Sequence, residues 1–277
     1  MKLSKRRNVI LNILVSLADS LVISYVLMFL TWLVRGMRVG LEGCVRIWAV
    51  YYILCAGIMI IISFGLAALR RGELRDITDR MFDKGCDDEY FRLLKEYMGG
   101  ELLPSQQLVF ASCYLEAGRM EDCRRELEKV DFAALSAPEQ EEYFNVCLYS
   151  AVLEENVELA NEIYRKAKHY LDRAVMKKRG SYVMHTLGML CYINGRLENA
   201  YSLFEAAGKD RSDGLKCECT IGRGLIYLAG GDKEGAKEMC YAAAELAQTY
   251  MQAARLKDLM MKVENAYRAE GRKKAGA

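Results

Sequence analysis

Proline and net charge are both scarce in this sequence. The chain of 277 residues contains only two prolines, Pro104 and Pro138, and its formal net charge is +2. Strand-rich domains need frequent turn breakers, so this scarcity favours an almost entirely helical protein. A charge near zero also lacks the clustered positive field that nucleic-acid binding needs. We therefore expect an all-α protein that binds no nucleic acid.

The residues that usually carry catalysis or bind metals are equally sparse. His169 and His185 are the only histidines, and the one close cysteine pair is Cys217 and Cys219, whereas a closed zinc site needs four such ligands. The sequence has no HExxH, no phosphate-binding glycine loop after a strand, no Gly-x-Ser-x-Gly and no CxxC. The ten cysteines are scattered along apolar helical faces, which is typical of core residues in a reducing compartment. We expect no catalytic residues, metal, cofactor or small-molecule substrate, and hence no enzyme.

Two long hydrophobic runs lie near the start of the chain. Residues 47–69 (IWAVYYILCAGIMIIISFGLAAL) are uncharged, and at about 1.5 Å per residue they can cross a hydrocarbon core of roughly 30 Å. Residues 9–34 form a second apolar run, with Asp19 as its only ionisable residue. We predict a transmembrane hairpin of two helices over residues 9–71, after a basic N-terminus at residues 1–8.

A cleaved signal peptide is the competing interpretation of the first run. The basic residues 5–7 precede it, and Ser16-Leu17-Ala18 resembles a cleavage site. The apolar run continues well past Ala18, however, and cleavage would leave a stub too short to span a bilayer. We therefore retain the membrane-spanning interpretation.

Basic residues favour one orientation of this hairpin. Cytoplasmic segments carry the excess of Lys and Arg next to membrane spans. Four basic residues precede the first run, namely Lys2, Lys5, Arg6 and Arg7, and three follow the second run, namely Arg70, Arg71 and Arg75. The connection between the two runs has three, namely Arg35, Arg38 and Arg46. We expect an integral membrane protein with both termini cytoplasmic and a short outer loop over residues 35–46.

Asp19 is the one intramembrane polar residue that we single out. Ionisable residues inside a span are costly and often functional, which suggests a polar contact with the second helix, another protomer or a membrane partner. In the simpler interpretation the embedded segment starts near Val15, and Asp19 lies one turn from the cytoplasmic face and reaches the head groups. Both interpretations remain open.

The remainder of the chain contains a repeated pattern. In residues 187–207 (LGMLCYINGRLENAYSLFEAA), small, turn, small, aromatic and small residues follow at intervals of 7, 5, 4 and 3. Similar patterns surround the corresponding residues Cys123, Ala160, Ala200 and Ala236, which are 37, 40 and 36 residues apart. A fixed period of this length is typical of stacked helical hairpins, in which small residues let paired helices approach and a large residue fills the groove to the next hairpin.

This pattern resembles the tetratricopeptide repeat. The resemblance implies an α-hairpin solenoid over residues 72–270, which the expected orientation places in the cytoplasm. After Ala243 no glycine or proline appears until Gly271, so we expect a long C-terminal helix that caps the last repeat, followed by a disordered tail at residues 271–277. The sequence departs from the family in three respects. It lacks the closing proline, its period exceeds the usual length of about 34, and the large aromatic early in the first helix is absent, its place being taken by Gln107, Phe144 and Met184 in three copies.

The same resemblance implies a groove along the inner faces of the first helices, which would hold a peptide or helix of a protein partner. Carrying the family's groove positions across gives Asn145, Tyr149, Tyr182, His185, Met189 and Tyr192. This strip is aromatic, which suits an apolar or helical segment. Only Asn145 suits a carboxylate clamp, which argues against recognition of an acidic C-terminal tail. Neighbouring repeats or the chain's own terminal helix would alternatively fill the strip.

These observations lead to two functional hypotheses. The first is a membrane-anchored scaffold or adaptor that binds a protein partner through its cytoplasmic solenoid. The alternative is an accessory subunit of a larger membrane complex for transport, secretion or sensing, whose transmembrane helices make the partner contacts. The partner's identity and the oligomeric state stay open.

Overall fold

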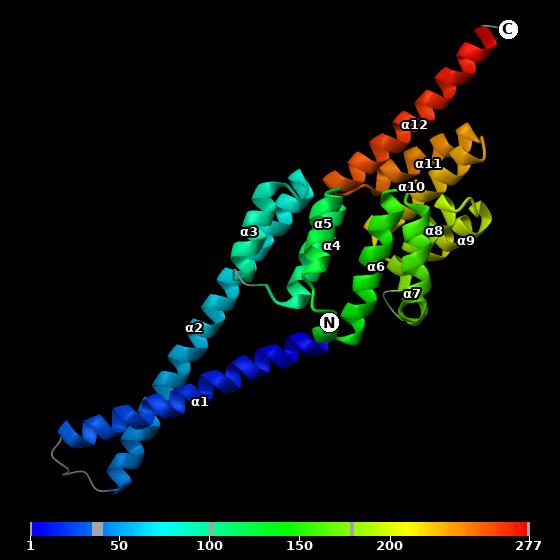
Figure 1. Cartoon of the computed structure of the whole chain (residues 1–277). Coiled ribbons are helices and arrows are strands. Elements are labelled where there is room, and N and C mark those ends of the chain that lie inside the picture. Colours follow the sequence, from blue (N-terminus) through cyan, green and yellow to red (C-terminus); the bar gives the residue numbers. More distant parts are fainter. Residues whose placement is uncertain (1, 35–40, 100–101, 178–179, 276–277) are drawn as a thin grey trace. The chain divides into compact units, whose positions relative to one another are not determined.

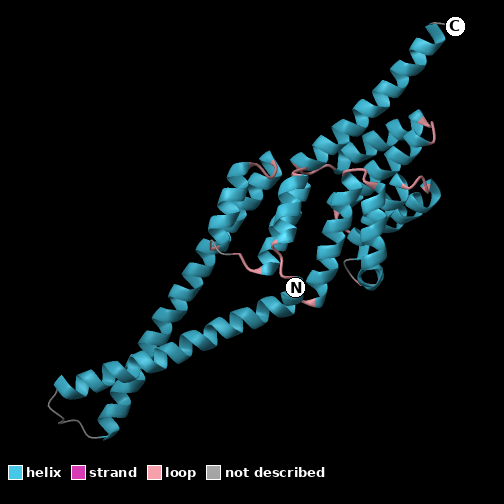
Figure 2. Cartoon of the chain, viewed as in Figure 1, coloured by secondary structure: helices cyan, strands magenta, loops and turns pink. Residues whose placement is uncertain are grey.

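The computed structural model describes residues 2–34, 41–99, 102–177 and 180–275. Over these ranges every regular element is a helix and none is a strand (Figure 2), which confirms the all-α prediction. The chain divides into two compact units, residues 1–76 and residues 77–277.

The first unit contains α1 (Lys2–Val34) and most of α2 (Leu41–Lys84). One helical segment among the described residues is long and apolar enough to cross a membrane, Gly43–Ser63 in α2, and only 6% of its most apolar stretch is buried. The apolar part of α1, Leu17–Leu33, is shorter. The Thr31 and Tyr51 hydroxyls join the two helices by a hydrogen bond of 3.0 Å. The outer loop expected at residues 35–46 lies partly outside the described residues, and its second half belongs to α2 instead.

The second unit begins with the last turns of α2 and continues as successive helical hairpins (Figure 1). The two prolines lie in the first turns of α4 and α6, where no hydrogen bond of the helix is lost. Its further elements are α3 (Asp88–Met98), α4 (Pro104–Glu116), α5 (Met120–Glu128), the 3₁₀ turn η1 (Phe132–Ala134), α6 (Ala137–Leu153), α7 (Val157–Val175), α8 (Gly180–Ile193), α9 (Leu197–Ala207), α10 (Asp213–Ala229), α11 (Lys233–Leu246) and α12 (Tyr250–Ala275).

Four hairpins, α4–α5, α6–α7, α8–α9 and α10–α11, are closed by the same turn. In each one, the residue in the left-handed conformation donates its N–H to the carbonyl three residues before it, and the next residue bonds the carbonyl five residues before itself, as in a Schellman motif. The left-handed residues are Gly118, Glu155, Gly195 and Gly231, with φ of 71°, 54°, 71° and 82°. Three of the four are glycine because a side chain is strained in this conformation.

Small residues allow close packing inside and between hairpins. Phe204 of α9 is almost completely buried, and its ring lies against Gly188 of α8 and Gly222 of α10. A Cβ atom at Gly188 would come within 2.8 Å of this ring, and one at Gly222 within 2.6 Å. Both glycines are therefore needed for the ring to fit, and burial of a side chain of this size contributes about 2–3 kcal/mol. The cores of successive hairpins adjoin in this manner along the unit.

The C-terminal helix differs from the expected one at both ends. The sequence suggests an unbroken helix after Ala243, yet α11 ends at Leu246 and α12 starts at Tyr250. A capping box starts α12: the Gln252 backbone N–H donates to the Thr249 hydroxyl, and the Thr249 N–H donates to the Gln252 side-chain oxygen, both at 3.2 Å. At its other end α12 continues past Gly271 to Ala275, where we expected a disordered tail. It packs on α10 and α11, in the place that a next hairpin would take.

Candidate functional site

Two adjoining cavities lie along the inner helices of the second unit, the first helices of the four hairpins. Cavity 1 has a volume of ≈ 420 Å³ and cavity 2 one of ≈ 410 Å³. Both volumes fall within the range of about 300–1,000 Å³ that is usual for ligand pockets. The two cavities share as lining residues Leu115, Glu116, Tyr149, His185, Glu218, Met251 and Arg255. We call the two together the groove.

All six residues predicted for the partner-binding strip line this groove. Met189 and Tyr192 of α8 line cavity 1. Asn145 of α6 and Tyr182 of α8 line cavity 2. Tyr149 and His185 line both. The structure thus brings together, from α6 and α8, side chains that were selected by their register in a repeat.

The strip is less exposed than a free binding surface would be. Tyr182 is 49% exposed, but Asn145, Tyr149 and His185 are each less than 9% exposed. Neighbouring side chains cover part of the strip, since His185 packs against Tyr149 and Phe204, and α12 forms one wall of the groove. The terminal helix and the neighbouring repeats are the two alternatives that the sequence offers for filling the strip. The contributions of α12 to cavity 1 are Met251, Ala254, Arg255, Asp258, Leu259 and Lys262.

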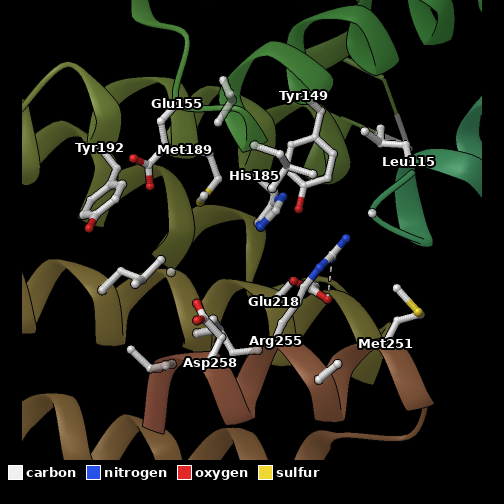
Figure 3. A pocket seen from close by; sticks show the side chains of 18 of the residues that line it. Leu115, Tyr149, Glu155, His185, Met189, Tyr192, Glu218, Met251, Arg255 and Asp258 are labelled. Carbon is white, nitrogen blue, oxygen red and sulfur yellow. Dashed lines mark ion pairs between the residues drawn. The ribbon is translucent and has the colours of Figure 1, made fainter. Parts of the chain in front are cut away.

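Arg255 of α12 lines both cavities, and its ion pair with Glu218 is drawn in Figure 3. Its guanidinium lies 2.9 Å from the Glu218 carboxylate of α10 and 3.3 Å from the Glu116 carboxylate of α4. It also lies 5.8 Å from the centre of the Tyr149 ring, a cation–π distance. One cation therefore links α12 with α4, α6 and α10, which come from three different hairpins.

Burial, assisted by the charge of Arg255, keeps His185 neutral. Burial lowers the pKa of His185 to about 3, and the charge of Arg255 contributes to that shift. The imidazole packs between aromatic rings, 5.5 Å from that of Tyr149 and 5.6 Å from that of Phe204. Burial also raises the pKa of the Glu218 carboxyl, and the neighbouring Arg255 opposes this rise. At neutral pH the groove therefore contains an uncharged imidazole beside a charged guanidinium.

Asn145 has an unsatisfied polar atom at cavity 2. Among the described residues, its side-chain oxygen Oδ1 is one of two buried side-chain polar atoms without a hydrogen-bond partner, the other being Nε of Arg223. Buried polar groups are almost always paired, and one that is not needs a reason. The reason can be a bound group, because this oxygen belongs to a cavity wall.

Other candidate chemistry is limited. Over the ranges that the structure describes, no group of three or more His, Cys, Asp or Glu side chains could hold a metal ion. All ten cysteines are free thiols. Asp19 lies on an exposed face of α1 in the first unit and lines neither cavity of the groove.

Sequence reasoning offered the terminal helix as one alternative for filling the strip, but it missed Arg255 and its partners. Arg255 interrupts an otherwise apolar face at Met251, Leu256 and Leu259, and this interruption is the signal that could have drawn attention to it. Glu218 and Glu116 carry no comparable signal, because isolated carboxylates on helices are common. Comparisons of the chain with protein-family models, curated proteins and solved structures give no match.

Proposed function

We propose that this protein is a membrane-anchored, non-enzymatic scaffold that binds a protein partner in the groove of a tetratricopeptide-like solenoid. In this proposal α1 and α2 form a two-pass anchor with both termini cytoplasmic, and the groove faces the cytoplasm. The observation that carries the proposal is the convergence of the six predicted residues on two adjoining cavities.

The apolar surface of α1 and α2 supports the anchor. Large hydrophobic side chains on both helices are exposed, among them Val22, Tyr25, Ile53 and Ile61. Contiguous exposed apolar surface of this kind marks an interaction site or a membrane surface. The length of Gly43–Ser63 suits a span, and the basic residues flanking the hairpin favour cytoplasmic termini.

The repeated turns support the solenoid. Their left-handed residues, Gly118, Glu155, Gly195 and Gly231, are separated by 37, 40 and 36 residues, the same spacing as the small residues of the second helices. A helical hairpin that is stacked on a similar neighbour buries a face that it cannot bury alone. Such a stack offers an extended inner surface, which suits binding of a peptide or helix.

The test is crosslinking in native membranes followed by mass spectrometry, with Tyr182→Ala and Tyr192→Ala compared with the wild type. Tyr182 is exposed at cavity 2, and Tyr192, which lines cavity 1, is half-buried beside the core around Phe204. We expect both variants to lose the same crosslinked protein. Tyr241→Ala is the matched control, since this tyrosine is 61% exposed on α11 outside the groove. An unchanged set of crosslinks in both groove variants would refute partner binding at this site.

A further inference from the structure

The charges of the groove restrict what it can bind. Glu116 and Glu218 share the single guanidinium of Arg255, so this cation is already neutralised by two carboxylates. Glu142 also lines cavity 2, whose described residues include no other Lys or Arg. Among these described residues an acidic ligand would find no free cation and would meet the Glu116 and Glu218 carboxylates instead. A cationic ligand is complementary to the same wall.

The hydrogen-bonding groups of cavity 2 indicate the same chemistry. The Asn145 Oδ1 atom is an acceptor that lacks a donor, in a side chain that is 8% exposed. Among the described residues the imidazole of His185 makes ring contacts but no hydrogen bond, and as a neutral ring it offers one acceptor nitrogen. A ligand that donates hydrogen bonds would satisfy these acceptors. Ammonium and guanidinium groups donate and do not accept.

Cavity 1 adds an apolar wall to the charged residues that it shares with cavity 2. This wall consists of Leu153, Met189, Ile193, Ile221 and Leu225 from the inner helices. Its other described charged residues are Glu155 and the pair of Asp258 and Lys262, whose charged atoms lie 3.0 Å apart. An apolar side chain packed against this wall would lose contact with water, which favours binding. Cavity 1 can therefore hold an apolar side chain next to a cation in cavity 2.

We propose, on the basis of the function proposed above, that the groove recognises a protein segment in which a Lys or Arg lies next to an apolar side chain. The cationic side chain enters cavity 2 and donates to Asn145 Oδ1 beside the Glu116 carboxylate. The apolar side chain fills cavity 1. The partner is thus a basic and apolar segment, in contrast to an acidic tail.

The experiment selects peptides from a random linear library on the full chain in detergent micelles. Tyr182→Ala and Tyr192→Ala variants serve for counter-selection, so that only peptides that need the groove are kept. We expect enrichment of Lys or Arg beside Leu, Ile, Met or Phe. The best peptide is then synthesised with its basic residue intact, replaced by norleucine, or replaced by Glu, and each dissociation constant is measured by fluorescence polarisation.

Matched variants assign the contacts. A hydrogen bond to a charged group corresponds to a change in affinity of about 10-fold to 100-fold, so we expect norleucine to weaken binding by at least about 10-fold. Asn145→Leu should weaken binding of the basic peptide by a similar factor and leave binding of the norleucine peptide unchanged. Asn145→Asp, which keeps the shape and adds a charge, should strengthen binding of the basic peptide. Glu116→Gln should weaken binding of the basic peptide, and Glu205→Gln, on the exposed face of α9, should leave it unchanged.

The outcomes distinguish this inference from the proposed function. Groove-dependent peptides without a basic residue, or equal affinity of the basic and norleucine forms, would overturn the inference and leave the proposed function standing. A library that yields no groove-dependent peptide would count against both. Tighter binding of the Glu peptide would reverse the assigned charge preference.

Discussion

The contact between Phe204 and Gly222 offers a quantitative test of how the hairpins pack. An added Cβ at Gly222 would lie 2.6, 2.7 and 2.9 Å from three ring atoms of Phe204. The ring has no room to retreat, because Gly188 lies against it at a similar distance. Gly222→Ala should therefore overpack the core, at a cost of about 1–3 kcal/mol.

An opposing gain must be subtracted from this cost. Replacing glycine by alanine inside a helix favours folding by about 1 kcal/mol. Because the ring is held from both sides, we take the upper part of the range and expect a net destabilisation of about 1–2 kcal/mol. For a domain of about 200 residues this lowers the melting temperature by roughly 2–8 °C.

Thermal unfolding of the full chain in detergent, followed by circular dichroism, measures this shift. Gly230→Ala, at the C-cap of the same helix, is the control: its added Cβ would meet no atom closer than 3.5 Å, and its backbone is right-handed, so the melting temperature of this variant should not fall. Phe204→Leu supplies the second background, in which Gly222→Ala should cost little because the ring is gone. A Gly222→Ala effect that is the same in both backgrounds, or a rise in melting temperature, would refute the packing argument.

Three further predictions concern the turns, the buried imidazole and the membrane anchor. Glu155→Gly should raise the free energy of unfolding by up to about 1 kcal/mol, because it removes a side chain from a residue with a left-handed backbone. Gly195→Ala should lower the free energy of unfolding by about 1–2 kcal/mol for the opposite reason, and denaturant unfolding measures both changes. The folded pKa of His185, about 3, lies below the ordinary value of about 6.5 for an unfolded chain, so its contribution to stability is present above pH 6.5 and is lost as pH falls towards 3. The free energy of unfolding of the wild type should fall by about 2 kcal/mol between pH 7 and pH 5, and this fall should be absent from His185→Leu. An equal fall in both proteins would contradict this prediction. A membrane-impermeant maleimide should label Cys44 from outside intact cells, and labelling only after lysis would contradict the proposed topology.

The elements that the sequence predicts well are those fixed by local chemistry. The helical class follows from the scarcity of proline, and the turn at Gly195 follows from the need for a left-handed residue after a helix. Positions such as His185 and Tyr192 could be assigned to one face because a fixed period determines which side of each first helix turns inward. The break before α12 was equally local, since Thr249 and Gln252 form a capping box, but it contains neither glycine nor proline and was overlooked.

The sequence leaves open whether the terminal helix lies against the groove, and the contacts that α12 makes there could not be predicted in the same way. Arg255 reaches Glu116 of the first hairpin and Glu218 of the last one, and these contacts depend on the curvature accumulated over all four hairpins. Small rotations between neighbours determine that curvature, and they arise from contacts such as those of Phe204 with two glycines. A periodic pattern indicates which residues face inward, but it does not give the width of the groove or what crosses it.

The two carboxylates that hold Arg255 are not equivalent, and the difference bears on how a cation could bind. The Glu218 side chain is 15% exposed, so removal of its partner would leave a charge in a poorly solvated site, which is strongly unfavourable. The Glu116 side chain is 50% exposed and lies farther from Arg255, at 3.3 Å, so its pairing contributes less than about 1 kcal/mol. An incoming Lys or Arg can therefore take Glu116 as its partner at little cost while Glu218 keeps Arg255 in place. The wall formed by α12 would then stay fixed during binding, and the partner would meet a groove that is already formed, without the loss of affinity that ordering it would bring.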